Sequence, residues 1–228
     1  MISLLGTVGT FQMAAMLTGL ILLAVCMTLL ISRLLSATAL SGLESSFLLE
    51  LPPYRKPQIG QVLVRSVLDR TLFVLGRAAA VAAPAGLLIW ILVHIPAGDG
   101  NLLQWCAAAL DPAGRLIGLD GVILMAFILG FPANETVIPI MIMAYSSLGT
   151  LQTLSGGELA ALFTAHGWTP VTVGCVMLFT MFHWPCSTTC WTIQREGGSL
   201  RWTLLSILLP TGCGVALCAL LSLAARLL

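Results

Sequence analysis

Charged residues are scarce in this sequence. Lys and Arg number 10 and Asp and Glu number 9 among 228 residues, which is 8% charged, whereas a soluble globular domain carries roughly 25%. The hydrophobic share is 58% and the mean hydropathy is +1.02. The formal net charge of +1 offers nothing to attract nucleic acid over a distance. The composition excludes an ordinary soluble domain and predicts an integral membrane protein whose main partner is the lipid bilayer.

Several chemical motifs are also missing. The sequence contains no HExxH and no GxSxG, and His183 has no obvious nucleophile and orienting partner, so we expect no enzymatic turnover from this chain. The CxxC pair of a structural zinc site is absent. Seven cysteines, an odd number, fall mostly in apolar segments. This pattern argues against a disulfide framework and leaves buried thiols or metal ligands as the two alternatives.

The apolar segments are long enough to cross a membrane. A helix needs about 20 apolar residues to span the hydrocarbon core, and the first run, 11–31, has no basic residue before Arg33 and exceeds the ~7–15 residues of a cleavable signal, so we read it as a retained span. We predict an all-α, polytopic membrane protein with four to five membrane segments, two of them interrupted or re-entrant. Continuous spans are expected at 11–33, 73–95 and 203–227, interrupted ones at 121–145 and 170–192, and an interfacial or half-inserted hairpin at 102–119.

Three regions and an orientation follow from the basic residues. Six of the ten lie between Arg33 and Arg77, so the positive-inside rule places this loop in the cytoplasm and the N-terminus outside. We divide the chain into a first transmembrane helix (1–36), a cytoplasmic connector (37–72) and a membrane domain (73–228). In the connector, prolines predict an extended stretch at 50–58, and apolar spacing predicts an amphipathic helix after it.

The downstream basic residues conflict with a simple topology. If 121–145 crosses the membrane fully, Arg195 and Arg201 lie outside. If it enters and returns, or if 102–119 completes a crossing, both arginines lie inside, as the charge rule prefers. We expect the chain to break at Gly130-Phe131-Pro132.

The first interruption places polar oxygens at membrane depth. Glu135 is the acidic residue that cannot be assigned to a loop or an interface, and a carboxylate at the centre of a membrane helix costs at least ~2.5–3.5 kcal/mol. Pro132 and Pro139 each remove a helical N–H donor, and unwound backbone at this depth is tolerated where it lines a cavity. Gly130 and the prolines thus open the helix, and Asn134 and Glu135 supply oxygens there, as in transporter cation sites. Alternatively, Glu135 is protonated or caps a helix start.

The second interruption carries nitrogen and sulfur. On one continuous helix, His183, Cys186 and Cys190 would share a face, and Pro185 would free one more carbonyl. Imidazole and thiolate suit late first-row metals, and oxygen ligands admit harder ions. The candidate metal ligands are Cys186, Glu135, Asn134, His183 and Cys190, and the breaks that line the ion path are at Gly130, Pro132, Pro139 and Pro185. A mixed lining of this kind would fit a borderline cation such as Fe²⁺, although the spacing alone is weakly specific and a buried cysteine is more often a small hydrophobe.

Four sequence stretches carry a family resemblance. In order, "SSFLLELPPYRKPQ", "LGRAAAVAAPAGLLIWIL", "GFPANE" and "HWPCSTTCWTIQREGGSLRW" resemble the carboxy-terminal half of ferrous iron transport protein B (FeoB), a bacterial inner-membrane Fe²⁺ transporter. The resemblance implies that 1–60 matches the region between two gate modules and 70–227 the second gate module. It also implies that Cys186 and Glu135 lie on or near the ion path. The Ser187-Thr188-Thr189 run departs from the small residues usual after Pro-Cys.

The resemblance also defines what this sequence does not contain. It has no GxxxxGK[ST] phosphate loop and no first gate module, so we expect another chain with the GTPase and that module as partner, or else a remnant, with homo-oligomerisation as a further possibility. The expected function is a permease subunit for Fe²⁺, with Mn²⁺ or Zn²⁺ as alternative ions and no permanently bound cofactor. The alternatives are a gate-type transporter of another substrate, such as a nucleoside, and a non-transporting membrane scaffold.

Overall fold

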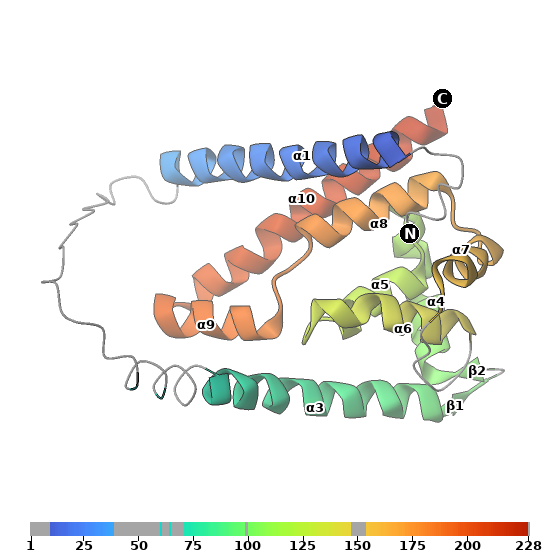
Figure 1. Ribbon diagram of the computed structural model, residues 1–228, viewed down its shortest axis with the longest axis horizontal. Helices are drawn as coiled ribbons and strands as arrows, with labels where there is room; N and C mark the ends of the chain where they lie inside the picture. Colours follow the sequence, from blue (N-terminus) through green and yellow to red (C-terminus); the bar gives the residue numbers. More distant parts are fainter. Residues whose placement is uncertain are drawn as a thin grey trace, which may run out of the picture. The chain divides into compact units, whose positions relative to one another are not determined.

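The computed structural model describes residues 10–38, 60, 64, 71–98, 100–146 and 154–227. These residues are almost entirely helical (Figure 1), which confirms the predicted all-α class. They form two compact units, Thr10–Arg77 and Ala78–Leu228. The predicted extended stretch at 50–58 and the amphipathic helix after it lie outside the described residues, except for Gly60 and Val64, both of which are helical and exposed.

The first unit contains α1 (Thr10–Ala37), which covers the predicted span 11–33. Large apolar side chains are exposed along its whole length, from Phe11 to Leu34. The hydroxyls of Thr18 and Thr28 donate to carbonyls one turn back, at 2.8 Å in both cases, so these polar groups are satisfied within the helix, as a lipid environment requires.

The second unit begins in α3 (Phe73–His94) and turns through a short hairpin, β1 (Pro96–Ala97) and β2 (Gly100–Asn101). The sequence did not predict this hairpin. Asn101 then caps α4 (Leu102–Leu116), because its side chain accepts from the N–H of Gln104 at 2.9 Å while the Gln104 side chain accepts from the Asn101 N–H at 3.3 Å.

A sharp corner joins α4 to α5 (Gly121–Leu129), and the two helices are bent by 110°. Asp120 caps α5 through the N–H of Ile123 at 2.7 Å, and Asp111 accepts from the N–H of Gly121 at 3.1 Å. A Cβ at Gly121 would collide with the carbonyl oxygen of Ala107, so glycine permits the close approach of the two helices.

The predicted break in 121–145 is present, and the chain reverses there. After α5 it passes through the short helix η3 (Asn134–Thr136) into α6 (Val137–Ser146), and α6 returns beside α5 (Figure 1). Helix α5 is apolar on every face. Ile123, Ala126 and Phe127 are at most 1% exposed, whereas Ile128 is 46% exposed. Residues 121–146 therefore form a helical hairpin.

The remaining helices are α7 (Gly156–Ala165), α8 (Pro170–Phe182), α9 (Ser187–Gly197) and α10 (Leu200–Leu227). The predicted interruption of 170–192 is the gap between α8 and α9. Helices α8 and α10 pack closely, with the Cys218 thiol donating to the Cys175 carbonyl at 3.2 Å. Arg195 lies in the last turn of α9, and Arg201 lies in the first turn of α10.

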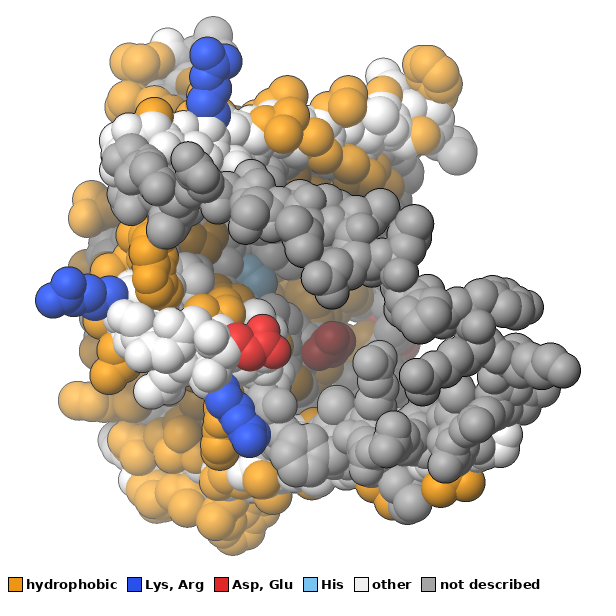
Figure 2. All heavy atoms as spheres, turned by 90° about the vertical axis from the view of Figure 1, so that its left-hand side faces the viewer, with side chains coloured by type: hydrophobic (Ala, Val, Ile, Leu, Met, Phe, Trp, Pro, Cys, Tyr) orange, Lys and Arg blue, Asp and Glu red, His pale blue; other side chains and the backbone are white. Residues whose placement is uncertain are grey.

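The described helices support a membrane protein by length and composition. Three segments could each cross a bilayer: Ala14–Ala37, Pro170–Gly197 and Leu200–Leu227. The bent pair α4–α5 would make a fourth, and Ala78–His94 is apolar but shorter. On the face shown in Figure 2, charged side chains are few among hydrophobic and uncharged ones.

Candidate functional site

The first break closes on itself through local hydrogen bonds. The N–H of Phe131 donates to the Ile128 carbonyl at 3.3 Å, which replaces the donor that Pro132 lacks. The N–H of Ala133 donates to Gly130 at 3.0 Å, and both the N–H and the hydroxyl of Thr136 donate to Ala133, at 3.0 and 2.7 Å. The backbone of the hairpin tip is therefore held in place without a ligand.

Pro139 does not break a helix, contrary to the expectation from the sequence. Helix α6 begins at Val137, so Pro139 lies in its first turn, where the N–H groups have no intrahelical acceptor in any case. The opening therefore comes from Gly130, the C-cap of α5, and Pro132, whereas Pro139 lies within the start of the returning helix.

The second break separates residues that the spacing had placed on one helix. His183 is the C-cap of α8 and Cys186 the N-cap of α9, and both have extended backbone. The condition under which His183, Cys186 and Cys190 would share one face, a continuous helix, is therefore not met, because residue spacing defines a face only along an unbroken helix. Pro185 lies in this break, as predicted.

The two breaks meet. The N–H of Ser187, the first residue of α9, donates to the carbonyl oxygen of Phe131 at 2.9 Å, so the tip of the hairpin touches the start of α9. Rings pack at the same place, because Phe127 lies 5.3 Å from the His183 ring between centroids and Phe179 lies 5.9 Å from Trp184.

Unpaired polar atoms are concentrated at this meeting point. Within the part of the chain that the structure describes, five buried side-chain N or O atoms have no hydrogen-bond partner, and four of them belong to the two breaks: Asn134 Oδ1, His183 Nε2, Trp184 Nε1 and Ser187 Oγ. An unsatisfied buried polar group costs about 1–3 kcal/mol, so such a concentration indicates a place for a ligand or water.

The hydrogen bond at the other ring nitrogen determines what His183 can offer. Its Nδ1 lies 2.9 Å from the Thr180 carbonyl oxygen, and a carbonyl only accepts, so Nδ1 carries the proton. The neutral ring then presents a lone pair at the buried Nε2. Metal-binding histidines are commonly oriented in this way by a backbone carbonyl.

The two thiols of the second break differ in their surroundings. Cys186 Sγ lies 3.1 Å from the Thr188 hydroxyl and 3.0 Å from the Thr189 hydroxyl and is half-buried. Cys190 is 7% exposed, and its thiol donates to the Pro185 carbonyl at 3.5 Å. Cys186 is therefore the more accessible of the two sulfur atoms.

The acidic residue Glu135 is exposed, in contrast to the buried unpaired atoms. Glu135 lies in η3 and is exposed, whereas its neighbour Asn134 is half-buried. Across the described ranges, no three His, Cys, Asp or Glu side chains come close enough to hold one ion. The two breaks thus present separate ligand groups and not one assembled metal site.

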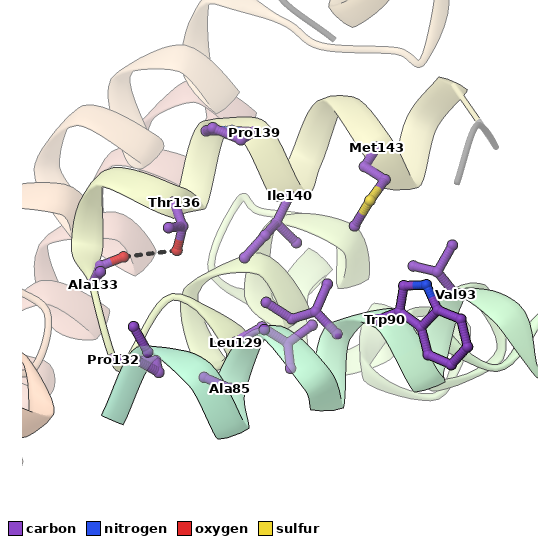
Figure 3. Close-up of a pocket in the computed structure, with 13 residues that line it drawn as sticks. Ala85, Trp90, Val93, Leu129, Pro132, Ala133, Thr136, Pro139, Ile140 and Met143 are labelled. Carbon is purple, nitrogen blue, oxygen red and sulfur yellow. Dashed lines mark hydrogen bonds between the residues drawn. The ribbon is translucent and has the colours of Figure 1, made fainter. Parts of the chain in front are cut away.

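An apolar cavity of about 380 Å³ borders the first break, between α3 and the hairpin (Figure 3). Pro132, Ala133, Thr136 and Pro139 contribute to its lining. The cavity is lined almost wholly by apolar groups, so it offers nothing to a cation.

Sequence reasoning missed Ser187 and Trp184. Ser187 joins the breaks through its backbone N–H, which no side-chain pattern reveals. Trp184 follows His183 directly and contributes one of the unpaired atoms, and its position beside the predicted ligand was the only signal available.

Two family models match this chain. The gate family model, described as "Nucleoside recognition", matches residues 75–200, more than half of the sequence, and the chain belongs to this gate family. A second model, described as "Ferrous iron transport protein B C terminus", matches residues 17–69. The chain therefore corresponds to a carboxy-terminal FeoB region, as the sequence stretches predicted.

Curated relatives agree with this assignment. An "Fe(2+) transporter FeoB" of Synechocystis is 29% identical over 72% of this chain and 26% of its own length. FeoB proteins of Staphylococcus aureus and Campylobacter jejuni are both 27% identical, over 84% and 83% of this chain and 29% and 33% of their own lengths. The chain thus spans about a quarter to a third of the curated relatives it matches. No solved structure matches this chain.

Proposed function

We propose that this chain forms the second gate of an Fe²⁺ permease in the bacterial inner membrane. The observation that carries the proposal is the group of buried, unpaired polar atoms where the two helix breaks meet. The relatives named as Fe²⁺ transporters support iron as the cargo.

The ligand groups of the two breaks would contact the ion one after another. Exposed Glu135 would attract the hydrated cation, and Asn134 Oδ1 and His183 Nε2 would replace part of its water. Cys186 would add a soft ligand that favours Fe²⁺ over Mg²⁺ or Ca²⁺. Because a metal-binding thiol must lose its proton, the start of α9 is a suitable place for Cys186, since helix N-termini stabilise negative charge. Cys190, more deeply buried, would bind the ion last.

The separation of these ligand groups also bears on which partner chain the permease needs. Transporter sites lie at the interface of structural repeats, so we propose that a first gate module completes the coordination and that a GTPase acts with it, both supplied by another polypeptide.

Growth rescue provides the test. In a strain without ferrous uptake, co-expressed with the GTPase and first gate module, the chain should restore Fe²⁺-dependent growth. We expect Cys186→Ser and Glu135→Ala each to abolish this rescue. Cys26→Ser, on exposed α1, is the matched control and should grow normally. Full rescue by both site variants would overturn the proposed ion path.

Nucleoside transport is the second candidate. The gate model's description and the rings around His183 and Trp184 favour it, because a base would stack on rings and bond to the unpaired Trp184 N–H. Labelled nucleoside uptake that falls in Asn134→Ala and Trp184→Phe, with iron uptake unchanged, would favour this alternative over Fe²⁺.

A further inference from the structure

The apolar cavity beside the first break is not explained by an ion path. On the α3 side, small residues line the end near the break, Ala82, Ala85 and Gly86, and larger ones line the other end, including Trp90. From the hairpin, Ile140 and Met143 point toward α3 (Figure 3). The cavity is therefore elongated along α3, from Pro132 toward Trp90.

The lining has little to offer a polar ligand. The Thr136 hydroxyl already donates to the Ala133 carbonyl at 2.7 Å, and the Trp90 indole lies at one end (Figure 3). A volume of about 380 Å³ is within the range of about 300–1,000 Å³ in which proteins bind small molecules. The chemistry of the walls selects an apolar occupant.

The shape of the cavity, which is elongated along α3 between helical elements, favours a narrow occupant. A hydrocarbon chain, one methylene wide, suits an elongated space between two helices.

One end of the cavity has the character of a membrane interface. Trp90 stacks on His94 with centroids 4.3 Å apart, and exposed His94 is followed by the β1–β2 hairpin. Tryptophan is enriched at the headgroup level of membranes. A lipid headgroup at this end would leave its tail pointing along α3 toward Pro132.

We propose that this cavity binds one acyl chain of a membrane phospholipid, with the headgroup near Trp90 and His94 and the tail against Pro132 and Ala133. The bound tail contacts the hairpin tip at Pro132 and Ala133. This site is independent of which cargo the gate carries.

Cavity-filling variants test the proposal. A Cβ built at Gly86 meets no heavy atom within 4 Å, so Gly86→Leu fills the space without a backbone collision, and Ala85→Phe fills it from the next position. Ala83→Leu, exposed and outside the lining, is the matched control. The full chain is placed in phosphatidylethanolamine and phosphatidylglycerol vesicles that contain a phospholipid with a photoreactive diazirine in its tail.

Mass spectrometry then compares labelling of residues 129–143 with labelling of exposed α1. We expect Gly86→Leu and Ala85→Phe to lower this ratio at least about fivefold, equivalent to about 1 kcal/mol, and Ala83→Leu to leave it unchanged. A probe with the diazirine in the headgroup should label the Trp90–His94 segment. The proposal would be overturned by an unchanged ratio in both filled variants or by labelling of Pro132 with the headgroup probe. Cross-linking of residues 129–143 to another protein, in place of lipid, would also overturn it. Circular dichroism verifies that the variants fold.

Discussion

The two breaks of this membrane domain are built differently. In the first, between α5 and α6, the chain reverses, and the tip satisfies its own backbone with bonds such as Ala133 N–H to Gly130. In the second, the chain continues from α8 into α9, and the start of α9 is tied to the first break through Ser187 and Phe131. The backbone of the first break is thus held by hydrogen bonds within the tip, whereas the second break is held by a hydrogen bond to that tip.

The largest expected effect comes from a substitution at the α4–α5 corner, which supports the helical hairpin 121–146. Gly121→Leu places a side chain against the Ala107 carbonyl and within 2.7 Å of the Asp111 nitrogen as measured from its Cβ. We expect the free energy of unfolding in detergent to fall by more than about 3 kcal/mol. Gly197→Leu, where a Cβ meets nothing within 4 Å, is the control. Equal unfolding midpoints for both variants would contradict the described corner.

The next largest effect concerns the far end of the hairpin. The Tyr145 hydroxyl donates to Asp120 and accepts from the Trp168 N–H, which lies at 2.9 Å, so it ties α6 to the α4–α5 corner. Tyr145→Phe leaves both partners unpaired and should lower the free energy of unfolding by about 1–3 kcal/mol. The exposed Thr164 hydroxyl is the comparison, and Thr164→Ala should change it less. Equal losses for the two would show that the buried network is not special.

The connection between the breaks can be cut at one atom. Ser187 is the first residue of α9, where proline is tolerated, and Cys186 before it has the extended backbone that precedes proline. Ser187→Pro therefore removes the N–H bond to Phe131 without breaking α9. We expect a loss of about 1–2 kcal/mol in the free energy of unfolding, and transport that falls with it.

Ser187→Ala is the matched control for the unfolding measurement, because it keeps the N–H and loses only the hydroxyl. If the alanine and proline variants unfold alike, the backbone bond does not hold the two breaks together.

The smallest effect lies far from both breaks. Asn101 caps α4, and Asn101→Ala should cost about 1 kcal/mol in thermal unfolding while leaving transport unchanged. Asn101→Ser retains a capping oxygen and should recover most of the loss. A transport defect in Asn101→Ala would show that the β1–β2 hairpin and the start of α4 affect the break region over a longer range than the contacts suggest.

Proline alone did not predict where helices break. Pro84 and Pro210 lie inside continuous α3 and α10, whereas Pro132 and Pro185 lie in gaps. Flanking residues do not separate the two cases either, because Pro210 is followed by Thr211 and Gly212 and still lies inside α10. Pro139 was predicted as a break and lies in a first turn, because its role depends on where α6 begins.

The sequence by itself determined the membrane class, the positions of the spans and the two broken segments, because apolar length and helix-breaking residues are local properties. Only the tertiary structure decided that the first broken segment returns, that its tip meets the start of α9, and that the buried Nε2 of His183 is the nitrogen left unpaired. The physical reason is that helical spacing relates side chains only along one unbroken helix. Which breaks meet depends on how the largely buried α5 packs among helices distant in the chain.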